Sequence, residues 1–327
     1  MKVNHRTFIV SGGSSGLGLA TVQMLVEAQA YVSILDLSPP PSNITGSRTQ
    51  YYRTDITAVA EVEKAIEDTV SWTKQTKAIL GGVINCAGVG AGAKIIDAQN
   101  EPHSLDLWNF ILAVNLTGTF NLTRLALKHM VHNEPEEGQD GERGVIILVS
   151  SSAAFEGQPG QAAYSATKGA LRSMALPLAR DLSRHSIRVM AIAPNTFVSS
   201  MTDKLPLKAR RSLENDLVYP KRFGQPEEFA ETVKWILECA YVNGETIRLS
   251  GALCSIVLTV HFLNNLLLRR REQNASKDVN LLGLFIDETF PVLPRMLYLS
   301  CEPERHPGAQ MFSNVLQIVE PCPQQLI

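Results

Sequence analysis

Tyr164 and Lys168 are the residues of this chain whose types and spacing point most directly to chemistry. Four residues apart on a helix, a phenol and an ammonium project from the same face, one turn apart. A tyrosine exchanges protons poorly near neutral pH because its ordinary pKa is about 10. A cation held close by favours the phenolate and brings that pKa towards the working range. The pair therefore indicates an acid–base site, although an exposed helix face without any function can show the same pattern.

A glycine-rich turn lies near the N-terminus, in the run Ser11-Gly12-Gly13-Ser14-Ser15-Gly16-Leu17-Gly18. Glycines at 12, 16 and 18 allow a tight turn, a close approach of backbone to a pyrophosphate, and close helix–strand packing. The helix that follows offers unpaired N–H groups and a positive dipole end to phosphates. The spacing is Gly-x-x-x-Gly-x-Gly rather than the commoner Gly-x-Gly-x-x-Gly. Since strand, turn and helix come in the required order, nucleotide binding is favoured over a purely structural turn.

Asp36 bears on the choice of nucleotide, because it ends the second strand-like run, 18 residues after Gly18. A carboxylate at that place can accept hydrogen bonds from the hydroxyls of an adenosine ribose, and it would repel a 2′-phosphate. No arginine follows directly; the next residues are Leu37, Ser38 and three prolines. We therefore expect NAD rather than NADP, with an ordinary turn aspartate as the alternative interpretation.

The elements that must position these groups alternate along the first 250 residues. Apolar runs predict strands at Thr7–Ser11, Tyr31–Asp36, Gln50–Thr54, Gly82–Asn85, Val145–Ser150, Arg188–Ala193 and Glu245–Leu249. Segments of helical period separate them, such as the stripe of Val62, Ile66 and Val70. This alternation predicts an α/β fold: a Rossmann-type doubly wound parallel sheet of about seven strands with helices on both faces. The polar run Asn133–Arg143 is expected to be a solvated loop.

Composition narrows the functional classes. The 327 residues are 45% apolar and 19% charged, and the net charge of −2 gives no general attraction to nucleic acid or to an anionic membrane. The five cysteines are scattered without metal-ligand spacing, so we interpret them as free thiols in a reducing compartment. The first residues lack a long apolar signal region. We expect no metal, and a location in the cytosol or an organelle matrix.

The βα rhythm stops after Leu249, which predicts one domain over residues 1–254 and an atypical C-terminal extension of unknown role over residues 255–327. Ser255–Leu268 is mostly apolar and precedes three arginines, so a membrane anchor is one interpretation. Polar residues interrupt this run, which falls short of the roughly 20 apolar residues that a spanning helix needs. A helix packed on the domain, or a poorly ordered appendage, is favoured instead.

In combination these motifs resemble those of the short-chain dehydrogenases/reductases, over residues 6–253. The motifs that carry the resemblance are Ser11–Gly18, Asp55 after the third strand, Asn85-Cys86-Ala87-Gly88 after the fourth, Asn115, Ser151, Tyr164 and Lys168. Three stretches, 155–158, 160–166 and 243–249, are similar to the 3-hydroxyacyl-CoA dehydrogenases of that family. The resemblance implies an oxidoreductase acting on CH–OH groups.

The resemblance also implies a role for each site residue. Tyr164 would exchange a proton with the substrate oxygen, and Ser151, 13 residues earlier, would hydrogen-bond that oxygen. Lys168 would lower the phenol's pKa and bind the nicotinamide ribose. Asn115 would hold a proton path through a water, unless it only bonds locally within a helix. The implied cofactor-binding residues are Gly12, Ser15, Gly16, Leu17, Gly18, Asp36, Asp55, Ile56, Asn85, Cys86, Ala87, Gly88, Tyr164, Lys168, Phe197 and Ser199.

Three residues depart from the family's pattern. Ser11 replaces the usual threonine and keeps its hydroxyl, and Cys86 replaces the second asparagine of Asn-Asn-Ala-Gly. Asn195 stands after Pro194 where a glycine is usual. Because asparagine tolerates positive φ better than most residues, we expect the turn at Asn195 to survive.

The first functional hypothesis is a dehydrogenase or ketone reductase that transfers a hydride between NAD(H) and a 3-hydroxyacyl-CoA or another hydrophobic secondary alcohol. In the segment Ser199–Phe223, Lys204, Lys208 and Arg211 would share one helical face, which suits a coenzyme A phosphate or is merely solvated. The alternatives are a tailoring ketoreductase of a secondary-metabolite pathway and a nucleotide-binding scaffold without turnover. We expect a small-molecule substrate and a homodimer or homotetramer, with no nucleic-acid partner.

Overall fold

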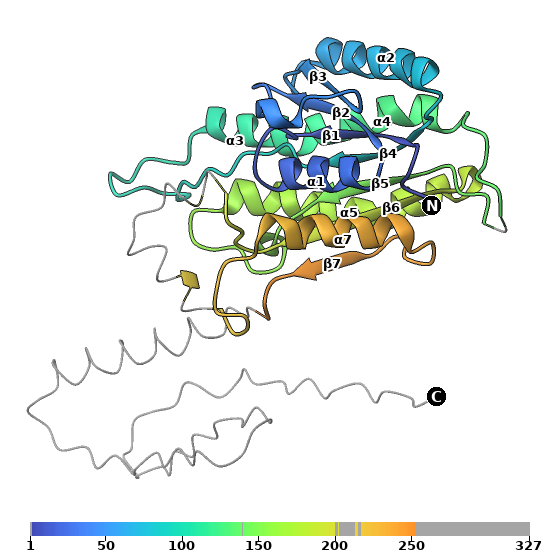
Figure 1. Ribbon diagram of the computed structural model, residues 1–327. Coiled ribbons are helices and arrows are strands. Elements are labelled where there is room, and N and C mark those ends of the chain that lie inside the picture. The colour runs from blue at the N-terminus through green and yellow to red at the C-terminus, as the bar shows by residue number, and fades with distance from the viewer. Residues whose placement is uncertain (1, 139, 200–201, 203–212, 215–216, 253–327) are drawn as a thin grey trace, which may run out of the picture. The chain divides into compact units, whose positions relative to one another are not determined.

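The structure, a computed structural model, describes residues 2–138, 140–199, 202, 213–214 and 217–252. Within them a parallel sheet has the strand order β3-β2-β1-β4-β5-β6-β7 (Figure 1). The strands are β1 (Thr7–Ser11), β2 (Tyr31–Asp36), β3 (Thr49–Arg53), β4 (Leu80–Asn85), β5 (Gly144–Val149), β6 (Ile187–Pro194) and β7 (Thr246–Leu249). The expected α/β fold with its doubly wound sheet is confirmed.

Helices cover both faces of this sheet (Figure 1). They are α1 (Gly16–Glu27), α2 (Val59–Thr76), α3 (Leu105–Leu112), α4 (Thr119–Met130), α5 (Ala162–Leu182) and α7 (Pro226–Glu238). A π-helical turn, η2 (Ala113–Gly118), joins α3 to α4, and short 3₁₀ turns lie at η1 (Ser42–Ile44), η3 (Ser152–Ala154) and η4 (Ser183–His185). One apolar cluster packs α1 and α7 on the sheet, and a second packs α2, α4 and α5 on the opposite face.

The burial of the central strands explains why apolar runs in the sequence predicted them. β4, β5 and β6 are buried at every position, because helices cover both of their faces. Such strands read as continuous apolar runs rather than as alternating ones. The strand order reverses between β1 and β4, which lie side by side. The crevice outside the carboxyl ends of the strands at such a switch point is where doubly wound sheets bind ligands.

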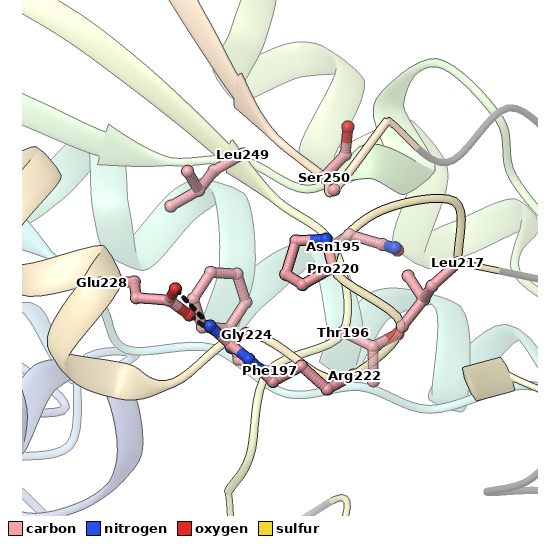
Figure 2. A pocket seen from close by; sticks show the side chains of 11 residues that line it. Asn195, Thr196, Phe197, Leu217, Pro220, Arg222, Gly224, Glu228, Leu249 and Ser250 are labelled. Carbon is pink, nitrogen blue, oxygen red and sulfur yellow. Dashed lines mark hydrogen bonds and ion pairs between the residues drawn. The ribbon is translucent and has the colours of Figure 1, made fainter.

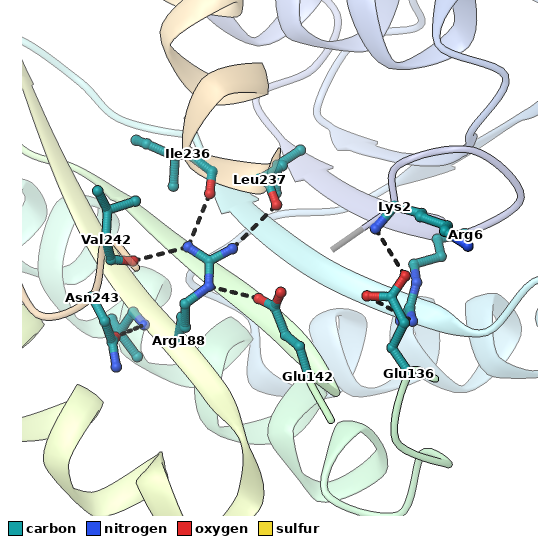
Figure 3. A network of polar contacts seen from close by, with 10 residues as sticks. Lys2, Arg6, Glu136, Glu142, Arg188, Ile236, Leu237, Val242 and Asn243 are labelled. Carbon is teal, nitrogen blue, oxygen red and sulfur yellow. Dashed lines mark hydrogen bonds and ion pairs between the residues drawn. The ribbon is translucent and has the colours of Figure 1, made fainter. Parts of the chain in front are cut away.

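The opposite, amino-terminal edge of the sheet carries a buried ion pair (Figure 3). Arg188, on β6, is 6% exposed, and its Nε donates to Glu142 Oε1 at 2.7 Å. Its other guanidinium nitrogens donate to the carbonyls of Ile236, Leu237 and Val242, at 2.9, 3.1 and 2.9 Å. Three of these four acceptors lie at or just after the C-terminal end of α7 or before β7. Arg188 therefore fastens both elements to β5 and β6.

The polar composition of Asn133–Arg143 predicts a solvated loop. In the structure, part of this loop is buried. Glu142 is only 5% exposed, and the side chain of Asn133 donates to Leu80 O at 2.7 Å. Glu136 Oε1 accepts the backbone N–H of Lys2 at 3.0 Å (Figure 3). That expectation is wrong for these three side chains, because the loop binds the start of the chain and the amino-terminal edge of the sheet.

The stretch Leu105–Met130 is long and apolar enough to cross a membrane by length and composition, but 56% of its apolar window is buried inside the protein. Its α4 portion packs on β4 and α2, as a core helix does.

Among the cysteines that the structure describes, Cys86 and Cys239 are free thiols. The apolar run at 255–268, the extension at 255–327 and the other three cysteines lie outside the described residues.

Candidate active site

The glycine-rich turn leads from β1 into α1 and packs against the segment that follows β4. Gly12 has φ +66°, and a Cβ there would lie 2.8 Å from the backbone nitrogen of Ala87. A Cβ on Gly18 would lie 2.1 Å from Gly12 O. Neither position can therefore carry a side chain without a backbone shift. The Ser11 hydroxyl accepts the N–H of Ala87 at 3.2 Å, so the residue that replaces threonine joins the two strand ends.

The start of α1 fits an anionic group. Its N-cap residue, Ser15, makes no side-chain capping bond, so the first N–H groups of the helix are left for another acceptor. The nearby Ser14 Oγ is buried and has no hydrogen-bond partner among the described residues. Buried hydroxyls normally have a partner, so this one is available to bond a water or a ligand atom. Ser199 reaches this turn, since a Cβ on Gly16 would lie 3.7 Å from Ser199 Cβ.

Asp36 lies next to the same turn. Its Oδ2 accepts the N–H of Ser14 at 3.0 Å, and its Oδ1 accepts the N–H of Ser38 at 3.1 Å. The carboxylate thus ties the glycine-rich turn to the end of β2. Each of its oxygens can accept further hydrogen bonds, so this structural role leaves room for ribose hydroxyls.

Asp55 and Ile56 follow β3 at the same edge. Asp55 Oδ1 accepts both the N–H and the hydroxyl of Thr57, at 2.8 and 2.7 Å. These hydrogen bonds lower the pKa of Asp55 and keep it ionised. Ile56 is 9% exposed and packs on Gly118, where a Cβ would lie 2.9 Å from it. The pair therefore offers one charged and one apolar group next to η2.

The segment after β4 contributes mainly backbone. Asn85 is 2% exposed, and its side chain donates to Thr123 Oγ1 and Ile147 O, both at 3.3 Å, so it is bound inside the protein. Burial raises the pKa of the Cys86 thiol to about 12, which keeps it protonated. Gly88 comes closest to the reactive groups: a Cβ there would lie 3.4 Å from Lys168 Nζ.

Ser151, Tyr164 and Lys168 meet at the carboxyl end of β5. Ser151 is 8% exposed and caps η3, where its Oγ accepts the N–H of Ala153 at 3.1 Å. Lys168 is 5% exposed, and its Nζ donates to Val149 O at 2.8 Å. The same Nζ lies 5.7 Å from the centre of the Tyr164 ring. The predicted pair therefore does share one helix face, with Ser151 beside it.

The protonation of this pair differs from the expectation. Burial raises the pKa of Tyr164, and a side-chain hydrogen bond with Ser151 acts in the opposite direction. Burial also lowers the pKa of Lys168 to about 8. The lysine does not bring the phenol's pKa below its ordinary value here, because both groups are desolvated and the ammonium is directed at a carbonyl. The phenol therefore stays protonated near neutral pH, and the lysine loses its proton closer to neutral pH than an exposed lysine does.

Asn115 lies in the π-helical turn and is fully buried. Its Oδ1 accepts the N–H of Val89 at 2.8 Å, and its Nδ2 donates to Val89 O at 3.0 Å and to Thr167 Oγ1 at 3.3 Å. These bonds reach across the chain, so local bonding within its own helix does not describe this side chain. π-Helical turns are frequent at functional sites. Asn115 thus holds the segment after β4 against the helix that carries Tyr164 and Lys168.

The loop after β6 departs from one expectation. Asn195 is not among the described residues with positive φ. Its side chain instead accepts a hydrogen bond from Ser152 Oγ at 3.0 Å. Phe197 is 6% exposed and lies against Gly224, where a Cβ would be 2.6 Å from its ring. Ser199, two residues on, donates its N–H to Thr202 Oγ1 at 2.8 Å.

A small hollow of about 120 Å³ lies behind this loop. Figure 2 shows its lining, with Arg222 and Glu228 joined by dashed lines. Leu217, from the segment expected to border the substrate, belongs to this lining. The basic residues at 204, 208 and 211 lie outside the described residues.

Sequence reasoning missed several supporting side chains. Ser150 Oγ donates to Lys168 O at 2.7 Å, Thr167 supports Asn115, and Ser152 meets Asn195. The run of three serines at 150–152 was a visible signal for two of them. Thr167 gave no signal, because its partner is 52 residues away in the sequence.

Comparisons with known proteins agree with this geometry. A family model described as short chain dehydrogenase matches residues 6–209. The 3-hydroxyacyl-CoA dehydrogenase type-2 of Homo sapiens is 42% identical over 248 residues, which are 75% of this chain and 94% of that protein. The Bos taurus protein of the same name is 40% identical over 250 residues, again 75% and 94%. A crystal structure of 3-hydroxyacyl-CoA dehydrogenase type-2 from Mycobacterium avium has a TM-score of 0.69 at 32% identity, covering 77% of this chain and 98% of that one.

Proposed function

Because the chain belongs to the short-chain dehydrogenase/reductase family and is an oxidoreductase that acts on CH–OH groups with NAD(P), we propose that it interconverts 3-hydroxyacyl-CoA and 3-oxoacyl-CoA with NAD(H). The observation that carries this proposal is the meeting of Ser151, Tyr164 and Lys168 at the carboxyl end of β5. Asn115 supports them from η2. A scaffold without turnover would have no need to keep a buried lysine beside a buried phenol.

The residues present fit a dinucleotide. The glycine-rich turn would hold the pyrophosphate with the open start of α1 and the buried Ser14 hydroxyl. The adenosine half would lie over Asp36, Asp55, Ile56 and the backbone of 85–88, and the nicotinamide half would lie towards Phe197 and Ser199. When bound, the nicotinamide gives or takes the hydride.

The protein's own groups then supply the proton. In reduction, the Tyr164 hydroxyl donates its proton to the substrate oxygen while the Ser151 hydroxyl donates a hydrogen bond to the same atom. The raised pKa of Tyr164 keeps the phenol protonated and ready for this direction. Lys168, with its pKa lowered to about 8, can return a proton to the tyrosine. Asn115 keeps the path in place through Val89 and Thr167.

Asp36 supports the choice of NAD over NADP. Its carboxylate stands at the end of β2, where it would accept the ribose hydroxyls and repel a 2′-phosphate. Both of its oxygens already accept backbone N–H groups, which hold the carboxylate at that place. The preference of this chain for NADH is therefore part of the proposal.

The substrate is proposed from the relatives. The type-2 3-hydroxyacyl-CoA dehydrogenases match this chain over 94% of their own length. We place the catalytic domain at residues 1–254 and propose a homodimer or homotetramer. A hydrophobic secondary alcohol or a polyketide-type ketone is the other substrate class, and the test below separates the two.

A substrate panel tests this proposal. The full chain is incubated with NADH or NADPH and with acetoacetyl-CoA, a 17-ketosteroid or a polyketide-type β-keto ester, and loss of absorbance at the reduced cofactor's band is followed. The expected result is turnover of acetoacetyl-CoA with NADH, at a kcat/KM at least about tenfold above that with NADPH. Turnover of another ketone alone would overturn the thioester assignment. Absence of turnover with every ketone would overturn the proposed activity.

A further inference from the structure

Three consecutive serines end β5, and their hydroxyls have three different partners. Ser150 Oγ donates to Lys168 O, which fastens β5 to α5. Ser151 Oγ accepts the N–H of Ala153 and lies next to the phenol. Ser152 Oγ donates to Asn195 Oδ1 at 3.0 Å, across to the loop after β6. The proposed mechanism uses the second of these hydroxyls and leaves the third without a role.

The sheet fixes the backbone on both sides of this third bond. The N–H of Ser150 donates to Ile192 O at 2.7 Å, which ties the end of β5 to β6. The N–H of Asn195 donates to Leu249 O at 2.9 Å, which continues the pairing of β6 with β7. Beyond these bonds the two chain segments diverge, one into η3 and the other into the loop of Phe197. The Ser152–Asn195 contact is a side-chain bond that joins them just past the sheet.

The two joined segments carry different halves of the proposed reaction. Ser151, which would hold the substrate oxygen, directly precedes Ser152. Phe197 and Ser199, which would border the nicotinamide, follow Asn195 by two and four residues. Asn195 does not have positive φ, so its side chain rather than an unusual backbone conformation restrains the loop.

We propose that Ser152 and Asn195 form a positioning pair, which sets the nicotinamide-binding loop at a fixed distance from Ser151 and Tyr164. This inference rests on the proposed function, because it assumes that the loop after β6 meets the nicotinamide. Neither side chain needs to touch a reacting atom. A displacement of the loop by a fraction of an ångström would misalign hydride and proton transfer.

A comparison of two ligands tests the pair without turnover. NADH carries the nicotinamide and ADP-ribose does not, while both share the adenosine and pyrophosphate. Dissociation constants for both are measured by calorimetry on the full chain, for Ser152→Ala, Asn195→Ala and the double variant. Each single variant is expected to weaken NADH binding roughly three- to tenfold, the net contribution of one hydrogen bond. ADP-ribose binding is expected to stay within about twofold, because the turn and α1 are untouched.

The double variant and two controls decide the outcome. If the two residues are coupled, the double variant should bind NADH as tightly as the single variant with the lower affinity. Ser152→Thr, which keeps the hydroxyl, is expected to restore NADH binding. Ser33→Ala removes a hydroxyl that bonds to Thr69 in the core between β2 and α2, and it should leave the ratio of the two dissociation constants unchanged. The proposed pair would be contradicted if NADH and ADP-ribose binding weakened equally, or if the effects of the two substitutions on NADH binding were additive.

The two proposals can fail separately. If the unmodified chain binds NADH but reduces no ketone, the proposed activity is contradicted while the ligand comparison still decides the pair. If the chain reduces acetoacetyl-CoA and the pair exists, Ser152→Ala should lower kcat roughly three- to tenfold with little change in the KM for acetoacetyl-CoA. The pair would be ruled out if Ser152→Ala changed neither kcat nor the ratio of the dissociation constants for NADH and ADP-ribose.

Discussion

The two edges of the sheet bury the same kind of group in different ways. At the amino-terminal edge, the Arg188 guanidinium makes four hydrogen bonds, one to a carboxylate and three to carbonyls. At the carboxyl-terminal edge, Lys168 is as deeply buried, yet its ammonium bonds to one carbonyl, Val149 O. Among the described residues no carboxylate lies within ion-pair distance of it.

This difference is the one expected between a cation that stabilises the fold and a cation at the proposed active site. A buried cation with several acceptors holds elements together, and removing it takes one buried partner from each of them. A buried cation without a carboxylate is costly to keep charged, so its pKa falls, as that of Lys168 does. Such groups cluster at functional sites. The same substitution at both edges tests this distinction.

Lys168→Met is expected to give the largest effect, on catalysis. Turnover should fall about 10²–10⁴-fold, because the proton path to Tyr164 is lost. The free energy of unfolding should change by less than about 1 kcal/mol or rise, because the variant no longer buries an ammonium. NADH-linked kinetics and urea denaturation measure the two effects. A loss of stability beyond about 3 kcal/mol would place Lys168 in the same class as Arg188.

Arg188→Met is expected to have the reverse effect. The free energy of unfolding should fall by about 3–5 kcal/mol, because Glu142 and three carbonyls lose a buried partner. Urea denaturation measures the loss, and NADH affinity of the protein that remains folded should stay within about twofold. A loss below about 1 kcal/mol would mean that this network adds little to the fold.

The pH dependence of stability gives the smallest expected effect. The folded pKa of Lys168 is about 8 and its ordinary value is 10.5, so the unfolded chain binds more protons between these values. Stability from this group therefore rises with pH from about 8, by at most about 1.4 kcal/mol per pH unit. Above pH 9.0 Cys86 acts oppositely, because its folded pKa is about 12. Denaturation at pH 8 and pH 9 should show the rise in the unmodified chain and not in Lys168→Met; equal slopes would contradict it.

Local sequence patterns predicted the carboxyl-terminal edge far better than the amino-terminal one. The glycine turn and the Tyr164–Lys168 pair lie within single elements, where helix and turn geometry connects spacing to position. Arg188 and Glu142 are 46 residues apart and meet only after β5 and β6 pair. Glu142 lies in an acidic, glycine-containing run whose composition is that of a solvated loop. Its burial could not be predicted because a tertiary partner overrides composition.

Smaller errors have the same origin. Asn195 was expected to rely on positive φ, whereas a hydrogen bond from Ser152, 43 residues away, restrains it. The pKa of Tyr164 was expected to fall next to a cation. Burial raises it instead, and the depth of burial of a single phenol is a property of the folded chain.

The most direct test of the central claim, that the carboxyl-terminal edge transfers a proton through Tyr164, is Tyr164→Phe. This change removes one hydroxyl and keeps the ring that packs beside Lys168. NADH oxidation with acetoacetyl-CoA and NADH binding are measured on the same preparation. We predict that kcat falls by about 10³-fold or more while the dissociation constant for NADH stays within about twofold. A kcat that stays within about tenfold of the unmodified chain would contradict the account.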